Sequence, residues 1–477
     1  MNYKMIIYIL GWILIFLGIF MAVPSITAIV YGESALWVFL GIAAFCAVTG
    51  KLITFKKPKN STLYSREGFI IVSLSWIVLS VFGALPFFIS GAIPSFINAV
   101  FESVSGFTTT GASILSEVES LPKSILMWRS FTHWVGGMGV LVFIMAFLPL
   151  SGGQNMHIMK AESPGPSVSK LVPRVKTTAL ILYAIYFALT LAEFIMLLTG
   201  GMNAFDALNT AFATAGTGGF GVKNDSLGGY SPYIQIVVTV FMLLFSINFN
   251  SYYFLMRGKL REAFTTEVKT FLIIVFAAIA TISINISGMF ETIGEAVRHS
   301  AFTVASIIST TGFSTADFNF WPELSRAILV MLMFVGACAG STGGGIKVSR
   351  ILILFKSMAK ELGCMIHPKQ VKKVKIDSHR IEHDVVRSVN VYMVCYMLIF
   401  MLSILLVSFD NHDLITSFTA VTATINNIGP GLELVGPTSN FAFFSDPVKI
   451  VLIFDMLAGR LELFPMLLLF TPTTWKK

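Results

Sequence analysis

One short phrase rich in threonine and glycine occurs four times in the chain, and it restricts the possible folds more than any other feature. The four copies are TTTG (108–111), TGGF (217–220), TTGF (310–313) and NIGP (427–430), and each follows a short, mildly amphipathic segment between two long apolar runs. Aligned without gaps, these segments bring one glycine of each copy into a single column: Gly111, Gly219, Gly312 and Gly429. A unit of roughly a hundred residues is therefore present in four diverged copies.

The apolar runs indicate the class of protein. Hydrophobic residues make up 55% of the chain and charged residues only 12%. Several runs exceed about 18 residues, the length at which an apolar segment can cross a bilayer. The composition excludes a soluble domain and predicts a polytopic, all-α membrane protein. The first run resembles the core of a signal peptide, but a second follows at 35–50, so we expect a first membrane helix rather than a cleaved leader.

Each repeat is predicted to contain an outward helix, then a half-length segment that turns back at the threonine–glycine phrase, and then an inward helix. Two N-terminal helices, at about 5–30 and 35–54, precede the repeats. The total is ten full spans and four re-entrant segments. The outward helices are expected at about 68–90, 177–200, 268–288 and 386–408, and the inward helices at about 124–150, 232–256, 324–355 and 446–470.

The distribution of basic residues supports this topology. Of the 33 lysine and arginine residues, 26 fall in the regions that the topology places in the cytoplasm, as the positive-inside rule requires. Both termini are then cytoplasmic, and the net charge of +8 reflects orientation in the membrane rather than nucleic-acid binding. All four repeats start inside, so a pseudo-four-fold axis along the membrane normal relates them, unlike the inverted repeats of many transporters.

These boundaries divide the chain into six segments. We predict an N-terminal two-helix hairpin, four pore repeats, and a basic cytoplasmic loop between the third and fourth repeats. In chain order the segments are 1–60, 61–160, 161–262, 263–360, 361–385 for the basic loop, and 386–477.

The four phrases have the chemistry of an ion filter. Non-helical backbone at membrane depth is tolerated only where it is buried in protein or lines water. Four converging turns would surround one axis, where backbone carbonyls replace the hydration shell of a cation. The column glycines permit left-handed backbone there, and the C-terminal end of each short helix favours cations. A single phrase is more simply a helix cap or a turn, but four aligned copies favour a filter.

Other glycine patterns and the acidic residues leave alternatives. GTGGFG (216–221) matches a dinucleotide-binding pattern literally but follows a helix rather than a strand, which excludes that site. Several carboxylates are expected near the outer mouth, where a ring of them would concentrate cations; ordinary acidic loop content explains each one equally well. These residues are Glu117, Glu119, Asp225, Asp317 and Glu433.

A glycine run in the third inward helix predicts a gate. Each glycine costs about 1 kcal/mol relative to alanine in a helix, so we expect this helix, alone among the four inward helices, to break at mid-membrane below the filter. Close helix packing through small residues is the alternative, but three consecutive glycines do not share one helix face. The residues assigned to the gate are Gly336, Gly340, Gly343, Gly344, Gly345 and Lys347, together with Arg460.

Arg460 is expected near the middle of the last inward helix. A cation at that depth must face the bundle interior. We predict that it projects into the pore, repels cations and hydrogen-bonds the glycine strip in a closed position. The alternative is a structural network with Asp455 or Glu462, although their spacings of five and two residues do not suit pairing on one helix face.

Four long segments, besides the phrases, carry a resemblance to a known family: AESPGP (161–166), KLVPRVKTTA (170–179), GACAGSTGGGIKVSR (336–350) and AGRLELFPMLLLFTP (458–472). With them the chain resembles the Trk/Ktr/HKT superfamily of potassium transporters, specifically the Trk-type membrane subunit of bacteria. The resemblance implies potassium uptake through a channel-like pore in the inner membrane. It also implies a homodimer and a cytoplasmic ring of separate nucleotide-binding regulatory subunits, with K⁺ as cargo, no catalytic cofactor and no enzymatic activity.

The resemblance also assigns the filter residues. The fourth phrase, NNIG, departs from the threonine-rich form and makes the ring asymmetric. An ion-coupled symporter on the same scaffold remains the alternative, but it needs an intramembrane titratable relay, and no carboxylate is clearly placed for one along the axis. The assigned residues are Thr108, Thr109, Thr110, Gly111, Gly216, Thr217, Gly218, Gly219, Ser309, Thr310, Thr311, Gly312, Asn426, Asn427, Ile428 and Gly429.

A basic cluster follows the expected gate. It is denser than the positive-inside rule alone requires. We expect it to bind the regulatory ring or anionic membrane lipid, and its position next to the gate favours the ring. The cluster consists of Lys356, Lys360, Lys369, Lys372, Lys373, Lys375 and Arg380.

Overall fold

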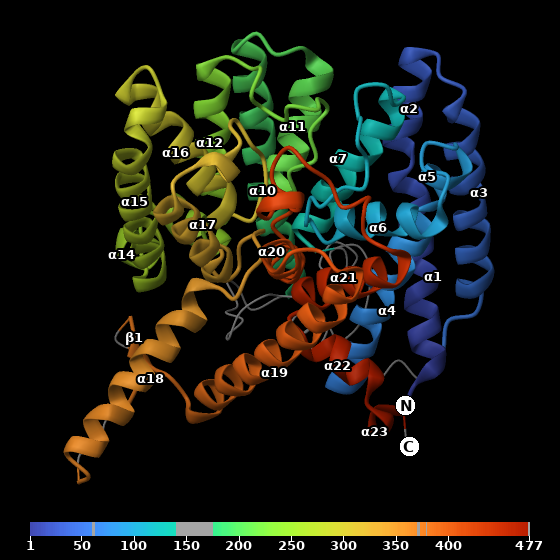
Figure 1. Ribbon diagram of the computed structural model, residues 1–477. Coiled ribbons are helices and arrows are strands. Elements are labelled where there is room, and N and C mark those ends of the chain that lie inside the picture. The colour runs from blue at the N-terminus through green and yellow to red at the C-terminus, as the bar shows by residue number, and fades with distance from the viewer. Residues whose placement is uncertain (60–62, 140–174, 370–372, 378, 476–477) are drawn as a thin grey trace.

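The computed structural model describes residues 1–59, 63–139, 175–369, 373–377 and 379–475 (Figure 1). The segment AESPGP (161–166) and the first part of KLVPRVKTTA lie outside these residues. The regular secondary structure of the described chain is helical apart from one antiparallel hairpin of β1 (Lys375–Ile376) and β2 (His379–Arg380). Both termini lie on the same side of the molecule, and α18 (Val348–Ile366) projects from the body on that side (Figure 1).

Six helical segments are long and apolar enough to cross a membrane, or up to seven if one bent pair is counted as a span, within the residues described. The N-terminal pair consists of α1 (Tyr3–Phe20) continued by α2 (Ala22–Tyr31), and of α3 (Ala35–Thr54). The outward helices of the repeats are α4 (Ser65–Gly83) continued by α5 (Leu85–Ile89), α10 (Val175–Thr199), α15 (Thr266–Ile286) and α19 (His383–Val407).

Four short helices lie between the spans, one in each repeat. They contain 12 to 16 residues, about 18–24 Å of helix, which is less than the roughly 30 Å of a bilayer core. Each begins at a side chain that accepts a backbone N–H as an N-cap, and these caps are Ser95, Asn203, Thr292 and Asp413. The helices are α6 (Phe96–Phe107), α11 (Ala204–Gly216), α16 (Ile293–Ile308) and α20 (Leu414–Ile425).

The inward helices differ from the expectation. Their described first halves contain only 13 to 15 residues. The prediction of continuous helices at about 232–256 and 446–470 is wrong, and so is the prediction that the third helix alone would break. Residues 140–150 of the first inward helix, expected at about 124–150, lie outside the described residues. The first halves are α7 (Lys123–Gly137), α12 (Pro232–Ser246), α17 (Glu323–Val335) and α21 (Asp446–Arg460); the segments that follow three of them are α13 (Phe249–Met256), α18 and α22 (Phe464–Phe470).

Local chemistry explains two of the unexpected breaks. The second helix bends by 93° between α12 and α13, where Ile247 is extended and the Asn248 side chain accepts the Asn250 N–H at 2.9 Å as a new N-cap. The fourth breaks after α21 because Glu462 and Leu463 have φ of 61° and 62°. Proline at position 465 then occupies the first turn of α22, where its missing N–H is tolerated.

Short elements complete the described chain. They lie between the longer helices or follow the last of them. They are α14 (Leu260–Ala263), α23 (Pro472–Trp475) and the 3₁₀ turns η1 (Ser287–Met289), η2 (Phe318–Phe320), η3 (Ser408–Asp410) and η4 (Glu433–Val435).

Candidate functional site

The four phrases have the same backbone conformation. In each copy the residue two positions before the column glycine lies in the left-handed region, with φ between 54° and 62°. The column glycine itself also has positive φ, between 78° and 96°. The left-handed residues are Thr109, Thr217, Thr310 and Asn427, and the glycines are Gly111, Gly219, Gly312 and Gly429.

This conformation ends the short helices in the same way each time. The next residue donates its N–H to the carbonyl five residues earlier, as from Thr110 to Ser105 at 2.9 Å and from Ile428 to Ala423 at 2.8 Å, which is the Schellman pattern of helix termination. β-Branched threonine rarely adopts positive φ, whereas asparagine tolerates it. Asn427 therefore preserves the four-fold backbone, and the departure of the fourth phrase affects side chains only.

The glycine column closes the four turns into a ring. A methyl group added to Gly111 would collide with the carbonyl oxygen of Gly218 in the second turn. A methyl group on Gly219 would collide in the same way with the Thr311 carbonyl of the third turn. One on Gly312 would collide with the Ile428 carbonyl of the fourth turn. On Gly429 it would lie 2.8 Å from the carbonyl oxygen of Thr110, back in the first turn. The turns therefore meet in cyclic order, and each glycine allows the carbonyl of its neighbour to approach.

One cavity lies at the ring, and another lies against the glycine segment between α17 and α18. The first, of about 760 Å³, is lined by all four column glycines and by residues that follow them in the chain. None of the five predicted acidic residues is among the described residues that line it, whereas Arg129 and Lys223 are. Glu433, for example, forms an ion pair with Arg326. Glu119 and Asp317 instead accept hydrogen bonds from Asn224 and Thr438, which do line this cavity. The other cavity, of about 870 Å³, is lined by the glycine segment, Arg460 and the end of α7.

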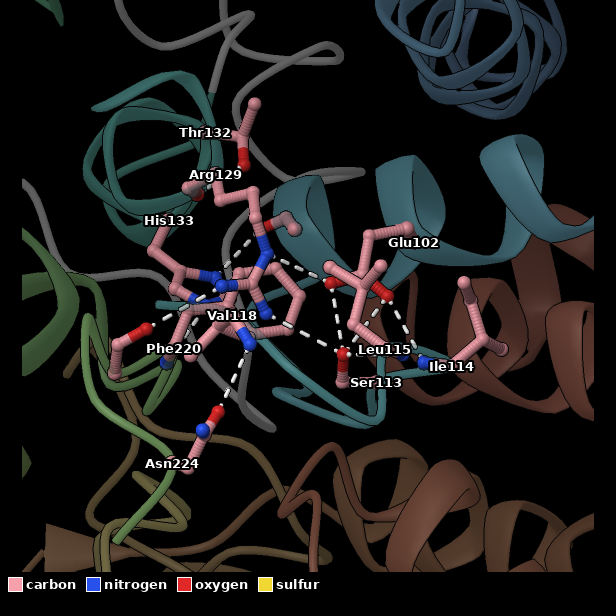
Figure 2. A network of polar contacts seen from close by, with 12 residues as sticks. Glu102, Ser113, Ile114, Leu115, Val118, Arg129, Thr132, His133, Phe220 and Asn224 are labelled. Carbon is pink, nitrogen blue, oxygen red and sulfur yellow. Dashed lines mark hydrogen bonds and ion pairs between the residues drawn. The ribbon is translucent and has the colours of Figure 1, made fainter. Parts of the chain in front are cut away.

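A buried ion pair supports the first turn (Figure 2). The Nε of Arg129, on α7, lies 2.8 Å from Oε1 of Glu102, on α6, and both side chains are buried. The Glu102 carboxylate also accepts the Ser113 hydroxyl and the Ile114 N–H, at 3.0 Å each. Arg129 donates in turn to the carbonyl of Gly221, 3.3 Å away in the second repeat. The pair thus connects one short helix with the segments that leave two turns.

His133 connects the same two turns one helical turn further along α7 (Figure 2). Its Nδ1 is 2.8 Å from the carbonyl oxygen of Gly106, and its Nε2 lies 3.3 Å from the Phe220 N–H that donates to it. These partners require the neutral tautomer with hydrogen on Nδ1. Sequence reasoning missed Glu102 and His133. A usable signal was present, because an acidic residue inside a short pore helix needs a buried partner.

The glycine segment between α17 and α18 is a non-helical loop that lies directly against the ring. Gly344 donates its N–H to the Thr310 hydroxyl at 2.6 Å, and Gly345 donates to the carbonyl oxygen of Asn426 at 3.1 Å. On its other side the loop meets the break in the second inward helix, where the Phe249 N–H donates to the Gly340 carbonyl at 3.0 Å. A methyl group on Gly344 would lie 2.5 Å from the Asn426 carbonyl oxygen, so the contact requires glycine.

Arg460 is the last residue of α21 rather than the middle of a continuous helix. Its guanidinium donates to the carbonyl of Thr342 in the loop at 2.8 Å, and to the carbonyls of Gly136 and Gly137 at 2.6 and 2.7 Å. Arg460 therefore joins the loop to the end of the first inward helix.

The two carboxylates considered as partners of Arg460 have other contacts. Asp455 accepts the Ser403 hydroxyl at 2.7 Å, and Glu462 pairs with Arg350. Lys347, at φ 84°, donates to the carbonyl of Gly343 within the loop.

Glu267 is a further contact of the loop that sequence reasoning missed. From the first turn of α15, its Oε1 accepts the N–H of Ala339 at 2.7 Å and that of Ser349 at 3.1 Å. One carboxylate thus holds both the loop and the first turn of α18. In the basic cluster, Lys356 donates to the carbonyl of Lys375 at 2.7 Å; Lys372 lies outside the described residues.

Long apolar spans around four turns, with one cavity lined by the ring glycines and another lined by the glycine segment, define a helical membrane transport protein. The profile of the TrkH family, described as "Cation transport protein", matches residues 36–477. The chain belongs to this family of transport proteins, which are not enzymes, and the family resemblance read from the sequence is confirmed.

Relatives match over the whole chain. It is 36% identical to the "Trk system potassium uptake protein TrkH" of Escherichia coli (strain K12), with 100% of both chains covered. It is 34% identical to the "Trk system potassium uptake protein TrkG" of the same organism, with 99% of both covered. The crystal structure of the potassium transporter TrkH from Vibrio parahaemolyticus superimposes with a TM-score of 0.89 at 34% identity, with both chains covered completely. The predicted all-helical membrane fold is confirmed.

Proposed function

We propose that this chain takes up potassium ions across the bacterial inner membrane through a channel-like pore, with the four turns as its selectivity filter. The observation that carries the proposal is the closed ring, in which every column glycine packs against a carbonyl of the next turn. The filter comprises the sixteen residues assigned above. The named function of the full-length relatives supports potassium as the ion.

The chemistry of the ring suits a desolvated cation. Backbone carbonyl oxygens replace lost hydration water without a charged side chain, and the C-terminal ends of four helices add a partly negative potential. The hydroxyls of several filter residues are already engaged; that of Thr108, for example, donates to the Val104 carbonyl at 2.7 Å. The carbonyls are therefore the main ion ligands in this proposal, and the Glu102–Arg129 pair keeps two of the turns in place.

The loop at 336–347 acts as the gate. It contacts the third and fourth turns from one side, and Arg460 ties it to α7. A cation leaving the ring on that side meets the loop and the guanidinium, which obstruct it sterically and electrostatically. Displacement of the loop then permits flux.

The chain works in an assembly. It forms a homodimer with cytoplasmic termini, surrounded by membrane lipid, and the basic cluster binds a cytoplasmic ring of nucleotide-binding regulatory subunits. Movement of α18, which continues directly from the loop, transmits regulation to the gate. Nucleic acid has no part in this function.

An ion-coupled symporter is the second candidate. Two intramembrane carboxylates favour it, because Glu193 on α10 and Asp455 on α21 are completely buried, and such groups commonly belong to proton relays. Glu193 lies on an outward helix beside Thr214 of the second short helix, and neither carboxylate is among the assigned filter residues.

Flux measurements in proteoliposomes test both candidates. A filter requires a reversal potential close to the potassium equilibrium value in mixed potassium and sodium, and comparable permeabilities for the two ions contradict it. A channel-like pore follows the potassium electrochemical gradient alone. Potassium uptake that requires a proton or sodium gradient at fixed voltage establishes the symporter instead.

A further inference from the structure

The left-handed residues of the turns share a backbone but not their side-chain contacts. The Thr217 hydroxyl donates to the carbonyl of Gly216 in its own turn, at 2.6 Å. The Asn427 amide donates to the Thr110 hydroxyl and to the Met456 carbonyl, at 2.9 Å each. The Thr310 hydroxyl instead accepts the N–H of Gly344, in the loop. The third turn thus uses this position to hold the loop.

The fourth turn contributes a second contact through its backbone. The Asn426 carbonyl accepts the Gly345 N–H, and the Asn426 side chain is itself fixed, because its Oδ1 accepts the Tyr396 hydroxyl at 3.1 Å and its Nδ2 donates to Thr422 at 3.0 Å. The loop therefore meets two oxygens on preorganised residues. Both oxygens are fully buried beneath it.

We infer that Thr310 and Asn426 form a latch whose two oxygens serve either the loop or the permeating ion, but not both at once. The inference rests on the proposed gate and filter. A hydroxyl and a carbonyl oxygen are the ligand types that a desolvated K⁺ requires, and each now faces an N–H dipole of the loop. An ion at the loop side of the ring must displace these donors.

The shared oxygens couple ion binding to gating. An ion that binds these oxygens favours the state in which the loop is displaced from the ring. By thermodynamic linkage, the loop in its bound position weakens ion binding by the same factor. The position of the loop then depends on the cation present, independently of the regulatory subunits. Thr310 and Asn426 are positioning residues in the closed state and ion ligands in the open state.

Three variants at Thr310 and Thr217 test the latch, with a fourth at Tyr396 in reserve. Thr310→Val removes the hydroxyl that the loop uses. Thr217→Val removes the same hydroxyl from a turn in which, among the described residues, it bonds only the Gly216 carbonyl, so it reports the general effect of losing a filter hydroxyl. Thr310→Ser keeps the hydroxyl. Tyr396→Phe removes the hydroxyl that holds the Asn426 side chain without replacing a residue of either turn, and it is used if Thr310→Val does not fold.

The readouts are rubidium tracer flux in proteoliposomes and thiol modification of Ser341→Cys in the loop, quantified on the peptide by mass spectrometry. Thr310→Val should raise flux and modification rate about fivefold over Thr217→Val, the factor that corresponds to about 1 kcal/mol for one hydrogen bond. Thr310→Ser should restore the wild-type modification rate. In the Ser341→Cys protein with no other change, replacing choline by K⁺ should accelerate modification of the thiol. Adding Thr310→Val should remove most of this dependence on K⁺.

Equal modification rates in Thr310→Val and Thr217→Val, or a wild-type rate that ignores K⁺, would overturn the latch. Deletion of 341–344 separates this failure from failure of the gate. If the deletion raises flux and Thr310→Val does not, the latch is wrong and the gate stands. If the deletion also leaves flux unchanged in a folded protein, the gate proposal itself is wrong, and the latch with it.

Discussion

Replacement of Gly111 by serine should reduce the selectivity for potassium over sodium, because its side chain enters the ring at a defined point. The new Cβ would collide with the carbonyl oxygen of Gly218, one of the carbonyls proposed to bind the ion. The backbone at Gly111 has φ of 78°, which a residue with a side chain rarely adopts.

The magnitude follows from these two effects. Left-handed backbone costs about 1–2 kcal/mol in a residue with a side chain, and displacement of the Gly218 carbonyl relieves the collision while it widens the ring. If about 1.4 kcal/mol of this perturbation is lost from the difference in binding free energy between K⁺ and Na⁺, the potassium-to-sodium permeability ratio falls about tenfold. The assay is the reversal potential in mixed potassium and sodium, measured in proteoliposomes with purified protein.

Gly91 provides a matched control in the same chain. Its φ of 75° is nearly equal to that of Gly111, but no atom of the described residues lies within 4 Å of an added Cβ. Gly91→Ser thus introduces similar backbone strain outside the ring, and it should lower stability without changing the ratio. An unchanged ratio in a folded Gly111→Ser variant would remove Gly111 from the filter, and an equal fall in both variants would attribute the effect to general strain.

Deleting 341–344 should raise basal flux several-fold, and wild-type flux in a well-folded deletion would return the glycines to a packing role. Arg460→Gln should increase potassium flux about fivefold, through loss of a hydrogen bond to the loop, with the permeability ratio unchanged; normal flux at normal expression would make the side chain a structural tie. Charge reversal at Lys373 and Lys375 should weaken co-purification with the regulatory subunits, and undiminished binding would leave the cluster with a topological role only. Glu102→Gln leaves a buried guanidinium uncompensated, so it should destabilise the protein by about 3 kcal/mol; a thermal unfolding midpoint equal to that of the wild type contradicts a strong buried pair.

The inward helices show where sequence patterns stop being informative. Apolar length predicted continuous helices, but α12 and α21 end where a capping asparagine follows at 248 and a proline follows at 465. Both residues are visible in the sequence, but the high hydropathy of the two segments favoured the prediction of continuous helices. Hydropathy measures transfer into lipid, and it does not detect a break whose freed backbone groups are satisfied by other parts of the protein.

The sequence by itself determined the membrane class, the four copies and the glycine column, because these depend on local composition and on a repeat that persists along the chain. Tertiary structure decided the contacts of the charged and polar groups at the site. Arg460 meets a carbonyl 324 residues away, at Gly136, and Glu102 finds its partner on another helix at Arg129. A buried charge or N–H requires a partner. The sequence can therefore indicate that a partner exists, but only the packing of distant segments decides which group it is.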